Sequence, residues 1–300
     1  AALVAWLSQD QGITINAENL ILTVGAAGGL NCFFHTVLSP GDEVICPAPY
    51  FVEYGFYCGN HGGVLRPVKS KPDSFELDLG AIAAAIGSKT RCLLINSPNN
   101  PSGVVYSADE LKALAELLTE ASSKYGRPVY LVSDEPYRFL NFSGRPLPSV
   151  FAHYKHSVIV SSFSKNLALA GERIGYVAAN PAIRNAGELM AGLVFSNRVL
   201  GYVNAPCLGQ KIINACIAKA DELTAPLFEV YAERRRLMAE VLDVAGIQYQ
   251  LPAGTFYFFP KAPEGMDDIA FVQRLLEQRI LAVPGAGFGY PGYFRLSLCL

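Results

Sequence analysis

The sequence lacks the features that would point to a membrane protein or to a nucleic-acid-binding protein. Its longest apolar runs fall far short of the ~20 residues that a membrane-spanning helix needs, and no signal peptide is visible at its start. Its formal net charge is −2, which gives no support to binding of nucleic acid or of an anionic membrane. The hydrophobic fraction of 51% instead predicts a globular protein with a large buried core.

Metal-ligand patterns are missing as well. The four histidines show no ligand spacing, and the seven cysteines form neither a Cys-x-x-Cys pair nor a Cys/His cluster. We therefore expect no metal site, and buried reduced thiols in a cytoplasmic protein. The chain starts without Met and stops just after a strand-like segment, so we interpret it as trimmed at both ends.

A serine-rich stretch around Lys165 is the most informative part of the sequence. The apolar run 157–160 predicts a buried strand, and Ser162, Ser164 and Lys165 follow it. A lysine leaving such a strand can be partly desolvated, which lowers its pKa and frees a nucleophilic amine. The two hydroxyls and the guanidinium of Arg173 suit a phosphate dianion. Together they describe a pyridoxal phosphate pocket with Lys165 as the Schiff-base residue. The alternative is an ordinary turn with a surface lysine.

Three further segments carry polar or small residues where buried strands end. Strand-like residues 18–24 run into the small-residue turn 25–29 and then a helix, which can bind phosphate through backbone N–H groups or can simply allow close packing. The strand ending at residue 96 leads into the turn SPNNPSG, residues 97–103. Asp134 ends another buried strand, where an acid is costly unless it is paired; a protonated pyridine nitrogen is one such partner, and a helix cap is the alternative.

The stretch 161–175 resembles the lysine region of the class I/II aminotransferases, the fold-type I pyridoxal phosphate enzymes. The resemblance covers nearly all 300 residues, and its motifs occur in the same order. The alternation of about seven strands with helices predicts an α/β fold, with a largely parallel seven-stranded sheet and helices on both faces. We expect a large cofactor-binding domain over residues 1–222, and a bridging helix with a smaller α+β C-terminal domain over residues 223–300.

The resemblance implies a role for each motif residue. Phe51, rather than Tyr50, lies flat against the pyridine ring, and Asp134 keeps the ring nitrogen protonated. Asn100 and Tyr137 reach the phenolate oxygen, and Arg295 clamps the substrate α-carboxylate, beside Asn100. The phosphate is held by Gly25, Ala26, Ala27, Ser162, Ser164 and Arg173.

These residues predict an aminotransferase that moves the amino group of an L-amino acid to a 2-oxoacid through a lysine aldimine. A pyridoxal phosphate lyase on the same scaffold would need the same cofactor residues, so it stays open. So does the ligand-sensing domain of a transcription regulator, although the neutral charge and complete catalytic set argue against it.

The resemblance to class I/II aminotransferases also implies a homodimer, because members of that family assemble each active site from two chains. We expect residues 195–206 to form a loop that approaches the partner's site. One subgroup of relatives carries a lysine where this chain has Ala27, and that lysine pairs with the distal carboxylate of aspartate. Arg198 is the only nearby cation by analogy, so we expect weak discrimination for aspartate over neutral donors.

Overall fold

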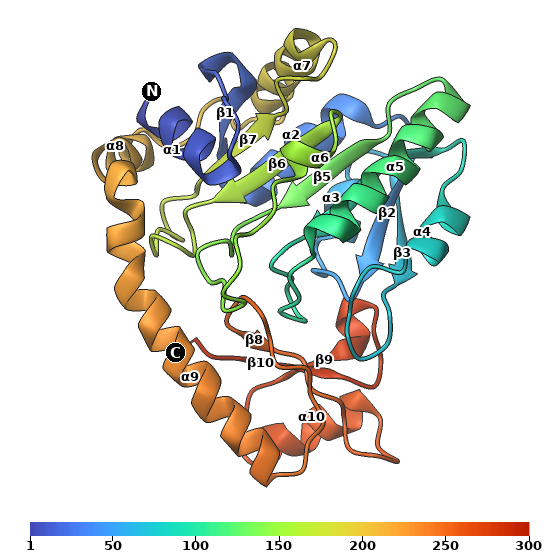
Figure 1. Ribbon diagram of the computed structural model, residues 1–300, viewed down its shortest axis with the longest axis vertical. Helices are drawn as coiled ribbons and strands as arrows, with labels where there is room; N and C mark the ends of the chain where they lie inside the picture. The colour runs from blue at the N-terminus through green and yellow to red at the C-terminus, as the bar shows by residue number, and fades with distance from the viewer. Residues whose placement is uncertain (300) are drawn as a thin grey trace.

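A seven-stranded sheet forms the centre of the computed structural model, which describes residues 1–299 (Figure 1). The strand order is β1-β7-β6-β5-β4-β2-β3. The strands are β1 (Leu20–Val24), β2 (Glu43–Ala48), β3 (Val64–Lys69), β4 (Thr90–Asn96), β5 (Tyr130–Asp134), β6 (Ser157–Ser162) and β7 (Ile174–Ala179). Only β7 is antiparallel to its neighbours, so β1 to β6 end at the same edge of the sheet. The expected largely parallel sheet is confirmed.

Helices cover both faces of this sheet because its buried strands are apolar on both sides. In β4, Cys92 and Leu94 pack on one face, while Leu93 and Ile95 pack on the other. The first face is covered by α2 (Gly25–Val37), α3 (Tyr54–Gly59) and α7 (Ala186–Val199). The second is covered by α1 (Ala2–Gln11), α4 (Leu79–Ala85), α5 (Ala108–Tyr125), α6 (Val150–His153) and α8 (Cys207–Cys216). The result is a three-layer α/β arrangement.

The long helix α9 (Ala220–Val244) leads away from this sheet to the C-terminal part of the chain (Figure 1). There, α10 (Asp268–Glu277) accompanies a second sheet. Its strands are β8 (Tyr257–Phe258), β9 (Val283–Pro284) and β10 (Phe294–Ser297), in the order β8-β10-β9. The structure contains this second sheet, whereas the division of the chain into two domains near residue 222 stays a prediction.

β8 pairs with the distant strand β10, Phe258 lying opposite Leu296. One detail of the expected secondary structure is wrong. Residues 195–199 are not a loop but the last turns of α7, which buries Leu193 and Asn197 against the molecule. No helix among residues 1–299 has the length and apolar character needed to cross a membrane.

Candidate active site

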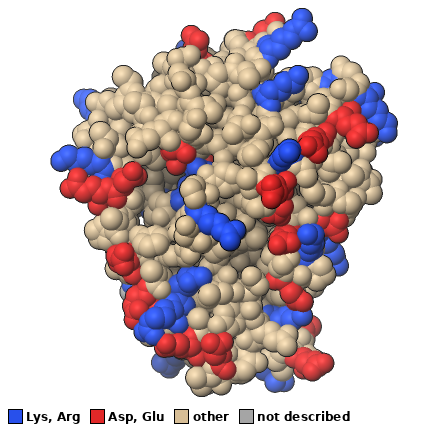
Figure 2. Space-filling model, viewed as in Figure 1, with Lys and Arg blue, Asp and Glu red and all other residues tan. Residues whose placement is uncertain are grey.

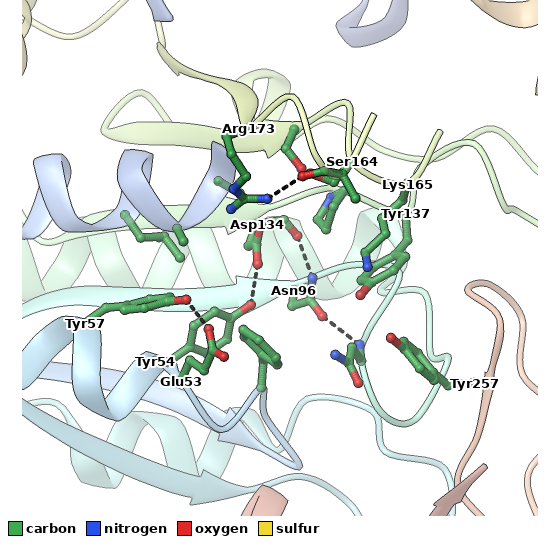
Figure 3. A pocket seen from close by; sticks show the side chains of 18 of the residues that line it. Glu53, Tyr54, Tyr57, Asn96, Asp134, Tyr137, Ser164, Lys165, Arg173 and Tyr257 are labelled. Atoms are coloured by element: carbon green, nitrogen blue, oxygen red, sulfur yellow. Dashed lines mark hydrogen bonds between the residues drawn. The ribbon is translucent and has the colours of Figure 1, made fainter. Parts of the chain in front are cut away.

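A cavity of about 330 Å³ lies at the edge where β1 to β6 end. In open α/β sheets, ligands bind beyond the carboxyl ends of the strands, which matches this position. The cavity gathers side chains that are far apart in the sequence, and Figure 3 shows ten of them by name. Its lining includes the predicted site residues Ala26, Ala27, Phe51, Asn100, Asp134, Tyr137, Ser162, Ser164, Lys165, Arg173 and Arg295.

The start of α2 forms one end of the cavity. Gly25 adopts φ +66°, and an added Cβ would come within 2.8 Å of Arg173 Nη2, so a side chain here would collide with the guanidinium. The Gly25 amide donates to the Arg173 carbonyl at 2.9 Å. The amides that follow it at this helix N-terminus have no intrahelical partner. With Arg173, Ser162 and Ser164 in the same lining, this end of the cavity could hold a phosphate.

Asp134 lies at the bottom of the cavity, as the last residue of β5. Its Oδ2 accepts a hydrogen bond from the Tyr54 hydroxyl at 2.6 Å, whereas its buried Oδ1 has no partner in the described chain. Burial raises the pKa of Asp134 from 3.8 to about 7, against the lowering effect of the Tyr54 hydrogen bond. A buried carboxylate oxygen without a partner is costly, so this atom could receive a cationic N–H from a ligand.

Arg295 faces the cavity from β10 with its guanidinium between two aromatic rings. Its Cζ lies 4.5 Å from the centre of the Tyr257 ring and 4.9 Å from that of Phe288. Nη1 donates to Asn100 Oδ1 at 3.0 Å, and the buried Nε has no partner among the described residues. Because this group pairs with no carboxylate among those residues, it is free to bind an anionic ligand.

Lys165 and Phe51 line the cavity between these two ends. Lys165 is half-buried on the loop after β6, and its Nζ lies 5.8 Å from the centre of the Phe256 ring. Phe51 lies edge-on to Tyr54, with ring centres 5.5 Å apart. Tyr50, the less favoured aromatic, packs instead near Gly289, where an added Cβ would come within 2.6 Å of its ring.

Sequence reasoning missed three residues that organise this site. Tyr54 orients Asp134, and Tyr257 supports Arg295. Asn96 links two strand ends, because its Nδ2 donates to the Asp134 carbonyl at 2.7 Å and its Oδ1 accepts from the Asn100 amide at 2.6 Å (Figure 3). An asparagine closing the apolar strand 90–96 was the available signal, since a buried amide requires hydrogen-bond partners.

Arg198, the predicted source of a further positive charge, is not part of the cavity lining that the structure describes. It is exposed in the last turn of α7. The cations that line the cavity are Lys165, Arg173 and Arg295. Glu53 adds a carboxylate to the same lining, and it accepts a hydrogen bond from the Tyr57 hydroxyl (Figure 3).

The fold and this set of side chains define an α/β protein whose cavity fits a flat, phosphate-bearing heterocycle with a protonated ring nitrogen. Comparison with known proteins agrees. The family "Aminotransferase class I and II" matches residues 1–300. The aspartate/prephenate aminotransferase of Thermus thermophilus is 32% identical over 301 residues, which cover 99% of this chain and 75% of that protein. The aspartate aminotransferase of Bacillus subtilis is also 32% identical, over 96% of this chain and 74% of that one.

Solved structures show the same similarity. An aminotransferase from Eubacterium rectale is 40% identical and superimposes with a TM-score of 0.94, over 100% of this chain and 74% of that one. The T. thermophilus aspartate aminotransferase with maleate is 31% identical, with a TM-score of 0.87 over 99% of this chain and 76% of that one. The chain belongs to the class I and II aminotransferases. It is a pyridoxal phosphate-dependent enzyme whose substrates are amino acids and oxoacids.

Proposed function

We propose that this chain transfers the amino group of an L-amino acid to a 2-oxoacid without a strong preference for aspartate, and that Lys165 binds the cofactor and moves the proton. The unpartnered Oδ1 of Asp134, in a cavity that Arg173, Ser162 and Ser164 also line, is the observation that carries this proposal. Bound pyridoxal phosphate supplies an aldehyde for the amino nitrogen and a ring that withdraws electrons. All other steps fall to side chains of the chain itself.

Each side chain has a defined task in this proposal. Arg173, Ser162, Ser164 and the amides of Ala26 and Ala27 hold the phosphate. Asp134, oriented by Tyr54, pairs with the ring N–H and keeps it protonated, and Phe51 packs on the ring. Asn100 and Tyr137 donate to the phenolate oxygen. Lys165 Nζ takes the proton from the substrate α-carbon as general base and, as general acid, would deliver it to the C4′ carbon of the bound cofactor. Borohydride reduction of the loaded enzyme should attach the cofactor to the peptide that contains Lys165.

Arg295 is the proposed anchor of the substrate α-carboxylate. We expect Arg295→Ala to weaken amino-acid binding by about 2–5 kcal/mol, the range for removing one partner of a buried charge pair. Arg295→Lys should recover only part of this loss, because an ammonium cannot make the planar two-pronged contact or stack equally between Tyr257 and Phe288. Apparent affinity is measured from the half-reaction with a series of amino-acid concentrations. An unchanged affinity in Arg295→Ala would exclude this residue from the substrate site.

The proposed weak discrimination for aspartate over neutral donors rests on the charges of the cavity. Its cations Lys165, Arg173 and Arg295 all have tasks, so no described cation remains for a distal carboxylate. Glu53 places a negative charge in the same lining. Since the relatives named above include aspartate aminotransferases, this chain is proposed to differ from them in donor range.

We expect weak discrimination: the half-reaction rate with aspartate should be less than several hundred times the rate with alanine or phenylalanine. Ala27→Lys should shift the discrimination toward aspartate by about 1–3 kcal/mol, on the scale of a charge-assisted hydrogen bond, and Glu53→Gln should shift it in the same direction. Arg198→Ala is the control, because Arg198 lies outside the described lining. A strong aspartate preference that Arg198→Ala abolishes would show that this arginine reaches the substrate.

We also propose that the enzyme is a cytoplasmic homodimer. The cysteines of the described chain are free thiols, which supports a cytoplasmic location because thiols are kept reduced there. Exposed apolar side chains from α7 to the start of α8 support the assembly: Val194, Phe195, Val199, Val203 and Leu208. Light scattering on serially diluted enzyme, with activity measured in parallel, should show activity only in the dimer. A fully active monomer would contradict the assembly.

A further inference from the structure

Two histidines that are 26 residues apart in the sequence lie side by side on the outer surface of the molecule. His35 is in the last turn of α2, and His61 follows α3. Their Nδ1 atoms are 3.3 Å apart, and their rings meet edge to face with centres 5.1 Å apart. Neither residue lines the cavity described above, so the aminotransferase reaction does not account for this pair.

The hydrogen bonds of Asn31 determine which nitrogen of neutral His61 carries the proton. Asn31 Nδ2 donates to the Ala27 carbonyl at 2.9 Å, so its Oδ1 must be the atom that faces His61. Oδ1 can only accept a hydrogen bond, and it lies 3.2 Å from His61 Nε2. The neutral tautomer that fits this contact donates from His61 Nε2 to Asn31 Oδ1, which also accepts from Asn60 Nδ2 at 3.2 Å. In that tautomer His61 Nδ1, the atom 3.3 Å from His35 Nδ1, is unprotonated.

This arrangement has the geometry of a metal-binding pair. The separation of 3.3 Å between the two Nδ1 atoms permits a hydrogen bond when one of them is protonated, and it also matches the spacing of two ligands on one metal ion when neither is. Two nitrogen ligands at the zinc distance of 2.0–2.1 Å and at a tetrahedral angle would be about 3.3–3.4 Å apart. Histidines that bind metals usually donate their other ring N–H to an oxygen, and His61 does so to Asn31.

We propose that His35 and His61 bind one tetrahedral transition-metal ion of the zinc type, through both Nδ1 atoms. No cluster of three or more His, Cys, Asp or Glu side chains suited to a metal occurs in residues 1–299. The exposed position of His35 leaves room for water at the two remaining coordination positions. The ion would tie the end of α2 to the chain after α3. Both helices begin at the active site, α2 beside Ala26 and α3 at Tyr54, so the metal would brace the two elements that surround the cofactor.

The test is titration of the pyridoxal phosphate-loaded enzyme with Zn²⁺ by calorimetry. We expect one ion per chain, reversal by a chelator, and a higher Tm when zinc is present. Magnesium should not compete, because it prefers oxygen ligands in octahedral geometry. X-ray absorption should show two nitrogen ligands at about 2.0–2.1 Å.

Variants assign the zinc to this pair of histidines. His35→Ala and His61→Ala should each weaken zinc binding by more than about 100-fold, beyond the 10–100-fold range for losing a residue that only supports a ligand. His153→Ala is the matched control, because His153 lies on α6 on the opposite face of the sheet, and it should bind zinc as the wild type does. Unchanged turnover without added metal would show that the variants are folded. Zinc binding that survives in both His35→Ala and His61→Ala, or no binding by the wild type, would overturn the proposal.

Discussion

Replacing Lys165 by alanine should abolish transamination, with a fall in turnover of at least about 10⁴-fold. General acid–base catalysis by one positioned group contributes about 10²–10⁴-fold, and Lys165 is proposed to bind the cofactor covalently as well. Lys165 Nζ is the amine that lines the cavity between Asp134 and Arg295. No other lysine lines the part of this cavity that the structure describes, so no neighbouring amine can replace it.

Two controls separate this chemical role from an effect on folding. Lys165→Arg keeps the positive charge but provides no nucleophilic amine, so it should be as inactive as Lys165→Ala. Lys155→Ala should keep full activity, because Lys155 is exposed before the opposite end of β6. Single-turnover rates with an amino acid, and mass spectrometry after borohydride reduction, provide the measurements. A Lys165→Ala enzyme that retains even one per cent of wild-type turnover would contradict the assignment.

The position of the site could be predicted from the sequence because its residues follow strands. Asp134, Asn100 and Lys165 each stand at or just after the carboxyl end of a buried apolar segment. In a largely parallel sheet these ends lie at one edge. Once the strands are recognised in the sequence, the polar residues that follow them are therefore expected to lie close together. Arg295 was predicted from the resemblance to the family, and the structure places it in the lining of the same cavity.

Contacts between distant segments could not be predicted in this way. Tyr54 and Asp134 are 80 residues apart, and nothing in either segment specifies their hydrogen bond. The pairing of β8 with β10 joins segments on either side of α10, so no local pattern in either segment specifies it. Residues 195–206 were expected to form a loop, yet α7 continues to Val199. Its last turns bury Ser196 and Asn197, which contact Thr36 and Cys32 of α2.

Neutralising Asp134 should reduce transamination by at least about 10²–10³-fold, the range for removing one preorganised electrostatic contact to a reacting group. Asp134→Asn has nearly the same shape but no charge, so it can still occupy the site beneath Tyr54. It cannot keep the ring N–H of the bound cofactor protonated. The variant should therefore bind some pyridoxal phosphate and yet turn over slowly. Near-normal turnover would show that the ring nitrogen has another partner.

The same carboxyl should also affect the stability of the enzyme without its cofactor. Burial raises the pKa of Asp134 from 3.8 to about 7. Between these values the folded protein holds a proton that the unfolded chain has lost, so the free energy of unfolding falls as the pH rises. The contribution of the Asp134 carboxyl to the free energy of unfolding is fully favourable below about pH 4, and it is lost as the pH rises past about 7. Three pKa units at about 1.4 kcal/mol each give a loss on the order of 4 kcal/mol.

Asp134→Asn removes this titration, so the cofactor-free variant should become more stable than the cofactor-free wild type as the pH rises from 4 to 8. Chemical denaturation at a series of pH values measures the difference. Tyr54→Phe provides a contrast, since it removes the hydrogen bond that lowers the pKa of Asp134, so its loss of stability should continue to a higher pH than that of the wild type. Bound pyridoxal phosphate should reduce the pH dependence of the wild type, because a protonated ring nitrogen would compensate the Asp134 carboxylate. Parallel stability curves for the cofactor-free wild type and Asp134→Asn would mean that Asp134 is already ionised and paired without the cofactor, contrary to the unpartnered Oδ1 on which its proposed role rests.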